Sequence, residues 1–316
     1  MAEKIPPLSL EGVQTYSLKA RPSKVSHQDF GQPWTQGQSF KNFIEKLPHI
    51  LAAAELQELA ATWVQARRQG HLVLLGFGAH VLKVGLSPVI IDLMRRGLLG
   101  GLALNGAGII HDAEIAMVGR TSEDVGQELG SGRFGMAEET ATFLNAAINW
   151  GGAQGLGLGE TVGRRLLEAG WPFNHLSVLA RAAELEVPVT VHVALGTDII
   201  HMHPSVDGAA VGAASHRDFR LFAALVSRLA GGLYINLGSA VVLPEVFLKA
   251  LSLARNLGHR VEPLTTANLD FIQHYRPLTN VVRRPTQPQG KGYALTGHHE
   301  IMFPLLAALV VEQWGG

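Results

Sequence analysis

The chain has 316 residues and a formal net charge of +0, with 47% hydrophobic and 16% charged residues. This composition supports a large buried core, built either as two domains or as one large α/β sheet. The balanced charge and the lack of a long basic run argue against a nucleic-acid partner. The absence of cysteine excludes disulfide bonds, thiolate nucleophiles and cysteine-bound zinc.

The first 24 residues are polar and contain proline, without the apolar stretch of a signal peptide. Apolar runs elsewhere are interrupted before the roughly 18 residues that a membrane-spanning helix requires. We therefore expect a cytoplasmic protein that does not enter the membrane.

Strands and helices are predicted to alternate along most of the chain. Residues 1–37 have the pattern of an irregular arm, and residues 40–69 have apolar positions at helical spacing. The strands predicted after this helix are 71–75, 101–105, 187–193, 232–236, 261–266 and 293–296. The helices predicted between them are 87–96, 136–150, 160–169, 176–186, 218–230, 244–257 and 299–312.

This alternation predicts an α/β fold with a Rossmann-like parallel sheet and helices on both faces. We divide the chain into residues 1–70, an arm and a helix packed on the main domain, and residues 71–316, one α/β domain.

Ligands of such sheets bind outside the carboxyl ends of the strands, and there this sequence is unusually rich in glycine. Gly76-Phe-Gly78, Gly106-Ala-Gly108 and Gly238-Ser239 each follow a predicted strand. Glycine lets the backbone approach a ligand, and loop amides can then face a phosphate. The Gly-x-Gly-x-x-Gly fingerprint is absent, and any single loop is explained as well by an ordinary turn. Together the loops predict a bound dinucleotide, with NAD as the first candidate.

Fourteen histidines form a second unusual feature, because several stand close together near these loops. We interpret them as acid–base or hydrogen-bonding groups around an organic substrate. A metal site is the alternative, because two imidazoles of an extended His201-Met-His203 would point the same way. Its candidate ligands are His201, His203, His298 and His299.

Arg283-Arg284 and Lys291 flank a Pro/Gln/Gly-rich stretch, residues 285–292. This stretch is predicted to be either a solvated surface loop or an arm that closes over the site or reaches a neighbouring subunit.

From residue 71 to the C-terminus the chain resembles deoxyhypusine synthase and its bacterial relatives. The resemblance lies in Leu-Val-Leu-Leu-Gly-Phe-Gly78, Ala-Leu-Asn-Gly-Ala-Gly108, Val-Pro-Val189 with Ala-Leu-Gly-Thr-Asp198, Thr266-Ala-Asn268, Arg276-Pro277 and Phe303-Pro-Leu-Leu306, all in the family's order. It implies an NAD-binding Rossmann-like domain and a homo-oligomer, a dimer or a tetramer of tight dimers. It implies NAD contacts at Gly76, Gly78, Asn105, Gly106, Ala107, Gly108, Gly238, Ser239, Thr266, Ala267 and Asn268.

The sequence departs from this family where the family's chemistry is performed. The family's catalytic lysine follows the Arg-Pro pair, but here the stretch reads Val282-Arg-Arg-Pro285. Residues that hold the polyamine in the family are replaced by His111 and His201. We therefore do not predict deoxyhypusine synthesis.

We expect an NAD-dependent oxidoreductase or transferase that acts on a small amine- or hydroxyl-bearing substrate. His111 or His201 would be the base and Asp112 or Asp198 its orienting group, with His298 and Glu300 completing the candidate catalytic set. The substrate is expected to be anionic, because Arg283, Arg284 and several histidines replace acidic groups. The alternatives are a transferase or cyclodeaminase that recycles bound NAD, a metal-dependent hydrolase, and a non-catalytic NAD-binding protein.

Overall fold

A computed structural model describes residues 3–315 of the chain, which separates into two compact units, residues 1–54 and 55–316. The first unit contains the 3₁₀ helices η1 (Leu18–Ala20) and η2 (His27–Asp29) and the helix α1 (Phe40–Glu45). Serine caps each of these helices, and the side chains of the arm that precedes α1 are mostly exposed. This unit therefore has little core of its own.

The second unit is built on a sheet of six parallel strands in the order β3-β2-β1-β4-β5-β6. The strands are β1 (Val73–Phe77), β2 (Gly101–Asn105), β3 (Val189–His192), β4 (Leu233–Leu237), β5 (Thr265–Asp270) and β6 (Lys291–Thr296). The chain reverses its direction of winding between β1 and β4, which are neighbours with Gly76 beside Asn236. The predicted fold class is thus confirmed, and the sheet has a topological switch point at this pair.

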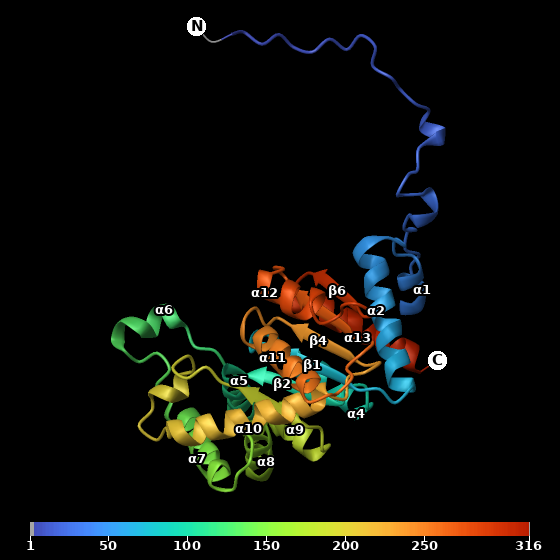
Figure 1. The fold of residues 1–316 in the computed structure, drawn as a ribbon. Helices are drawn as coiled ribbons and strands as arrows, with labels where there is room; N and C mark the ends of the chain where they lie inside the picture. The colour runs from blue at the N-terminus through green and yellow to red at the C-terminus, as the bar shows by residue number, and fades with distance from the viewer. Residues whose placement is uncertain (1–2, 316) are drawn as a thin grey trace. The chain divides into compact units, whose positions relative to one another are not determined.

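Helices cover both faces of the sheet and its β3 edge (Figure 1). On one face, α10 (Gly208–Val226), α11 (Val242–Asn256) and a π-helical turn (Leu278–Arg283) enclose a core with Phe222, Tyr234 and Phe247. The other helices include α3 (His80–Lys83), α4 (Ser87–Arg95), α5 (Gly106–Val118), α6 (Val125–Glu128), α7 (Glu138–Ala153), α8 (Leu158–Ala169), α9 (Val178–Glu184), α12 (Tyr275–Pro277) and α13 (His299–Trp314). Helix α8 contacts β3, α7 packs on α8 and α10, and α9 packs on α8 and α4.

The single helix predicted over residues 40–69 is two helices, because Pro48 lies in a break between α1 and α2 (Leu51–Arg68). Most of α2 belongs to the second unit, where Trp63 is fully buried and its Nε1 donates to Leu98 O at 2.9 Å. Arg67 donates from Nε to Gly97 O at 2.8 Å.

Two strand ends differ from the prediction in a way that matters for the site. Strand β1 continues to Phe77, so Gly76 lies inside it. Strand β5 begins at Thr265 rather than at Val261, because Pro263 has no N–H to donate to a neighbouring strand. Thr266, Ala267 and Asn268 are therefore inside a strand and not in the loop that follows it.

Within residues 3–315, no helix combines the length and the apolar character that crossing a membrane requires.

Candidate functional site

A small pocket lies at the carboxyl ends of β2 and β3, and we call it the β2–β3 pocket. Its volume is about 180 Å³. Its walls come from α3, α5, the segment 122–134 and the loop after β3. The lining residues are Lys83, Ala107, Ile110, His111, Glu114, Ser122, Glu123, Val125, Phe134, Thr197, Asp198 and Ile199. The pocket thus gathers one lysine, one histidine and three carboxylates from distant parts of the chain.

His111 and Glu114 are three residues apart on one face of α5, and both contact the hydroxyl group of Thr121. Thr121 donates to Glu114 Oε2, and its Oγ1 lies 2.7 Å from His111 Nδ1. Because the Thr121 proton is directed to Glu114, His111 must donate from Nδ1, which leaves Nε2 as an acceptor. Burial, with a smaller effect of Lys83, lowers the pKa of His111 to about 4. His111 is therefore neutral at pH 7 and can accept a hydrogen bond through Nε2, while burial disfavours its protonated form.

Asp198 stands on the loop after β3 and faces the start of α5. Its Oδ2 lies only 2.0 Å from the position that a Cβ on Gly106 would occupy. Burial raises the pKa of Asp198 to about 6. A carboxyl group with a pKa near neutrality is suited to exchange protons with a ligand.

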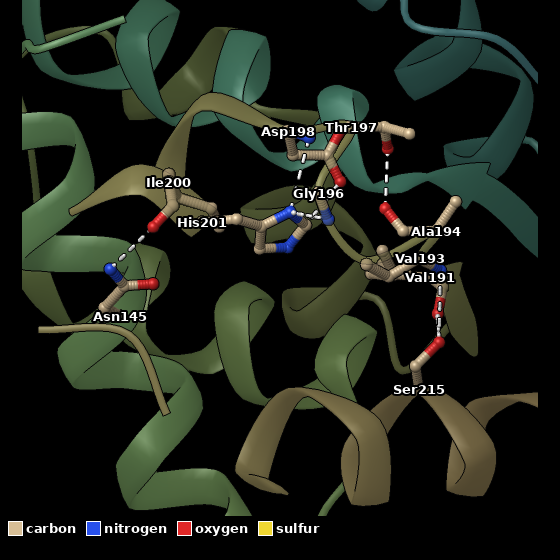
Figure 2. Close-up of polar contacts among 10 residues, drawn as sticks. All are labelled: Asn145, Val191, Val193, Ala194, Gly196, Thr197, Asp198, Ile200, His201 and Ser215. Carbon is tan, nitrogen blue, oxygen red and sulfur yellow. Dashed lines mark hydrogen bonds and ion pairs between the residues drawn. The ribbon is translucent and has the colours of Figure 1, made fainter. Parts of the chain in front are cut away.

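His201 lies behind Asp198 on the same loop and does not line the β2–β3 pocket (Figure 2). Its Nε2 is 4.0 Å from Asp198 Oδ2. Of this pair, the Asp198 carboxylate therefore lines the pocket and the His201 imidazole does not.

Asp112 has a structural role, and this corrects its placement among the catalytic residues. The carboxylate is fully buried and accepts hydrogen bonds from Ser177 Oγ at 2.6 Å, Val178 N at 2.7 Å and Leu179 N at 3.1 Å. It thereby caps the N-terminus of α9. Asp112 follows His111 by one residue on α5, so the two side chains point in different directions.

A second group of side chains lies at the switch point, around the ends of β1, β4, β5 and β6, and we call it the switch-point cluster. His299 is 1% exposed, and within residues 3–315 neither of its ring nitrogens makes a hydrogen bond. Its Nε2 is 3.4 Å from Asp270 Oδ1, and its ring lies 5.6 Å from that of His80. The exposed Phe271 contacts the same rings.

Gly78 and Gly238 form the floor of this cluster. A Cβ on Gly78 would lie 2.4 Å from Gly238 O, and one on Gly238 would lie 2.7 Å from the His299 ring. Gly238 also has a φ of +64°, which favours glycine. Their amides are already paired, because Gly78 N donates to Leu237 O and Gly238 N to Leu269 O, both at 3.0 Å. These glycines therefore supply space rather than the phosphate-binding N–H groups that the sequence suggested.

His298 and Glu300 lie at the outer side of the switch-point cluster, at the start of α13. The His298 side chain is 70% exposed, and its ring stacks on Phe271 with 6.1 Å between the centroids. His298 Nδ1 is 3.9 Å from Glu300 Oε1, which is too long for a hydrogen bond.

Several predicted cofactor contacts are core residues instead. The Gly76 Cα packs under the Tyr234 hydroxyl, and Thr266 donates from Oγ1 to Val281 O at 2.7 Å. Ala267 is fully buried within β5. Asn268 accepts from Asn236 Nδ2 at 2.7 Å and donates to Gln273 Oε1 at 2.7 Å. These side chains hold the sheet together below the ligand-facing edge.

The remaining residues predicted to contact NAD either pack against other side chains or lie at the carboxyl edge of the sheet. Gly108 packs on Leu104, because an added Cβ would lie 2.5 Å from its Cδ1. Ser239 accepts from Leu243 N at 3.2 Å and so supports the first turn of α11. Asn105, Gly106 and Ala107 form the start of α5, and Ala107 lines the β2–β3 pocket.

The four histidines proposed as metal ligands are used separately. His203 Nδ1 lies 2.7 Å from Ser205 Oγ, and its Nε2 lies 3.3 Å from Glu138 Oε2. In the part of the chain that the structure describes, no three His, Cys, Asp or Glu side chains are arranged to hold a metal ion.

Sequence reasoning missed Lys83, Glu123 and His80. Lys83 and His80 belong to α3, a four-residue helix too short to show a periodic pattern. Their place in the sequence could still have identified them, because both lie within the short segment that follows the end of β1. Lys291, which flanks the Pro/Gln/Gly-rich stretch, begins β6, the edge strand on the other side of the sheet from β3.

Comparison with solved structures identifies the fold. The chain is similar to a candidate deoxyhypusine synthase from Entamoeba histolytica, at a TM-score of 0.52 and 11% identity, over 89% of this chain and 96% of that one. The chain has a deoxyhypusine synthase-like fold. A candidate LOR/SDH protein from Methanococcus maripaludis is similar at a TM-score of 0.53 and 12% identity, over 98% of this chain and 75% of that one.

Two larger enzymes contain a similar region. AgrE, solved in a ternary complex with ornithine and NAD⁺, is similar at a TM-score of 0.53 and 12% identity, over 83% of this chain and 33% of AgrE. ArgZ, a cyanobacterial arginine dihydrolase, is similar at a TM-score of 0.52 and 16% identity, over 82% of this chain and 31% of ArgZ. The chain thus spans about a third of the length of each of these two proteins. No protein-family model and no curated protein match the sequence.

Proposed function

We propose that the protein is an NAD-dependent enzyme that oxidises, or transfers a group from, a small amine-bearing substrate bound in the β2–β3 pocket. The observation that carries this proposal is the convergence of His111, Glu114, Glu123 and Asp198 on one small cavity at the carboxyl ends of β2 and β3 in a parallel sheet. Ligands of open α/β sheets bind outside the carboxyl ends of the strands.

The switch-point cluster suits a dinucleotide. The unpaired nitrogens of His299 leave hydrogen-bonding capacity at the ends of β1 and β4, where Gly238 lets this ring lie against the backbone. Phe271, which is 47% exposed, offers an aromatic face on which a planar ring can stack. The ternary complex of AgrE with NAD⁺ supports the same cofactor for this fold.

The β2–β3 pocket is suited to a small substrate. Its volume of about 180 Å³ lies below the roughly 300–1,000 Å³ typical of sites for larger ligands, so a whole dinucleotide does not fit inside it. Glu114, Glu123 and Asp198 outnumber Lys83, the pocket's one basic side chain apart from His111. This balance favours a cationic amine over the anionic substrate expected from Arg283 and Arg284. Those two arginines belong to the region of the π-helical turn, where Arg284 donates to Asn280 Oδ1 at 3.0 Å.

Bound NAD would supply the hydride acceptor for a carbon that bears the amine. The chain's own residues would bind and deprotonate the substrate. Glu114 and Glu123 would attract the ammonium group, Asp198 would take the proton that the amine loses, and Nε2 of His111 would accept a hydrogen bond from the substrate. Because the stretch Val282-Arg-Arg-Pro285 stands where the family's catalytic lysine is expected, we do not propose deoxyhypusine synthesis.

Calorimetric titration of the purified protein with NAD tests the cofactor. We expect binding by the native protein and at least a tenfold loss in Gly238→Ala, whose Cβ would meet His299. Gly170→Ala is the matched control, because Gly170 has a similar φ of +61° and nothing lies within 4 Å of that added Cβ. Absence of NAD binding by the native protein contradicts the proposal.

Absorbance of NADH tests the reaction with a panel of primary amines, including ornithine, arginine and aliphatic diamines, against carboxylic acids without an amine. We expect turnover or saturable binding for amines only, and a loss in Asp198→Asn. NAD binding without any response to an amine would favour the non-catalytic alternative. The dimer or tetramer and the cytoplasmic location remain predictions.

A further inference from the structure

The imidazole of His201 holds the backbone of the loop that carries Asp198 (Figure 2). Its Nδ1 accepts hydrogen bonds from Gly196 N at 3.1 Å and from Asp198 N at 3.3 Å. A ring nitrogen that accepts cannot carry a proton, so the hydrogen of the neutral ring is on Nε2. One nitrogen atom therefore ties together the two ends of the turn Gly196-Thr197-Asp198.

The other ring nitrogen is directed toward the Asp198 carboxylate without bonding to it. His201 Nε2 is buried, makes no hydrogen bond within residues 3–315, and lies 4.0 Å from Asp198 Oδ2. The two side chains are only 7% and 5% exposed. At this separation, a positive charge on the ring would strongly favour the ionised carboxylate, whereas the neutral ring does not.

The loop is also held from the other side. Asn145 of α7 donates from Nδ2 to Ile200 O at 3.1 Å, and Thr197 donates from Oγ1 to Ala194 O at 2.7 Å. Among the described residues packed around His201, Asp198 is the titratable group within ion-pair distance, while Glu138 of α7 is paired with His203.

We propose, resting on the function given above, that His201 is a positioning residue. In its Nε2–H form it fixes the turn 196–198 so that the Asp198 carboxyl lies against Gly106, at the wall of the β2–β3 pocket. His201 acts through Asp198 and does not touch the substrate. A carboxylate oxygen could also accept from the two backbone N–H groups, but its negative charge beside Asp198 would be repulsive, whereas the neutral imidazole accepts without adding charge.

The tautomer can be checked in the native protein, which removes any doubt about folding of a variant. Nitrogen NMR of ¹⁵N-histidine-labelled protein should show Nδ1 of His201 unprotonated and Nε2 protonated at pH 7. Burial lowers the pKa of His201, so the neutral form should persist to a lower pH than in a solvent-exposed histidine. A proton on Nδ1 would overturn the proposal.

Two amide variants test whether the hydrogen-bond acceptor must lie at the position of Nδ1, or whether any polar side chain at residue 201 is sufficient. His201→Asn places its Oδ1 near the site of Nδ1, whereas His201→Gln places its oxygen one bond farther out, near Nε2. Hydrogen–deuterium exchange at the amides of residues 196 and 198 should accelerate at least about tenfold in His201→Gln and change little in His201→Asn. Equal exchange in the native protein and both variants would overturn the proposal.

The pH dependence of amine binding distinguishes the two roles of His201, because a residue that only stabilised the fold would not change its midpoint. The midpoint set by Asp198 should shift in His201→Gln and return toward the native value in His201→Asn. An unchanged midpoint in His201→Gln would overturn the proposal. The exchange and tautomer measurements need no ligand, so they decide the role of His201 even where the native protein binds neither NAD nor an amine.

Discussion

At the scale of single residues, the glycines at the carboxyl edge act by leaving space. The Asp198 carboxylate occupies the space where a Cβ on Gly106 would lie, and the His299 ring occupies the space where a Cβ on Gly238 would lie. The amides of Gly78 and Gly238 are used within the sheet and are not free for a phosphate. Glycine is therefore needed at positions 106 and 238 because a polar side chain packs directly against the backbone there.

Gly106→Ala should displace Asp198 while leaving the fold intact. The new Cβ would lie 2.0 Å from Asp198 Oδ2, so the carboxyl and its turn must move. We expect amine affinity to fall at least about tenfold, since 1.4 kcal/mol is enough for that loss. Calorimetry would measure the affinity and urea unfolding the stability, with Gly212→Ala as the control, because nothing lies within 4 Å of that added Cβ. Native affinity in Gly106→Ala would contradict the assigned position of Asp198.

Asp112 allows a structural and a catalytic role to be separated at one residue. Asp112→Ala removes three hydrogen-bond acceptor contacts at the start of α9 and leaves buried donors unpaired. We expect a loss of about 2–4 kcal/mol in the free energy of unfolding. NAD and amine affinities of the folded fraction should stay native. A variant of native stability that has lost only turnover would restore the catalytic assignment.

At the scale of elements, the outer edge of β3 is closed by side chains of α10. Asp218 Oδ2 accepts from Val191 N at 2.8 Å and from Gly159 N at 2.9 Å, and Ser215 Oγ accepts from Val193 N at 3.1 Å. An edge strand would otherwise present unpaired backbone groups. One buried carboxyl thus joins β3, α8 and α10, the framework that supports the loop carrying Asp198.

This carboxyl should make stability depend on pH. Burial raises the pKa of Asp218 from 3.8 to about 7. Because the folded state holds this proton more tightly than the unfolded state, its contribution to stability is present at low pH and is lost as pH rises through that window. Urea unfolding at several pH values should show Asp218→Asn with a flatter profile than the native protein between pH 4 and 7. Parallel profiles would mean that Asp218 does not titrate there.

At the scale of the whole molecule, the boundary between the two units falls within α2 rather than after it. Residues 55–316 form one unit, and Trp63 of α2 is fully buried in it. Burying a tryptophan contributes several kcal/mol, so this unit depends on α2 for its core. The expected division at residue 70 would remove that side chain.

Two shortened chains test where the stable unit begins. A chain that starts at residue 51 keeps all of α2 and should melt within a few degrees of the full-length protein. A chain that starts at residue 71 loses Trp63 and should unfold at a temperature lower by about 10 °C or more, since 3–5 kcal/mol is removed. Calorimetry checks both. Equal melting temperatures for the two shortened chains would show that the second unit does not depend on α2.

The sequence alone determined the fold class, because short apolar runs that alternate with helical patterns can be buried only as a parallel sheet covered by helices. It also placed His111 and Asp198 near ligand-facing edges, since residues after parallel strands gather at one end of the sheet. It misplaced β5, where polar Thr266 and Asn268 do not look like core, although Val281 O and Asn236 satisfy them there.

Only the tertiary structure decided which residues meet. Asp112 and His111 are adjacent in sequence, yet one caps α9 and the other faces the β2–β3 pocket. Lys83, Glu123 and Asp198 are far apart along the chain and become neighbours when β2, β3 and α3 pack together. Periodicity reports which face of an element is apolar, whereas the partner of each polar group depends on contacts between elements that local sequence does not encode.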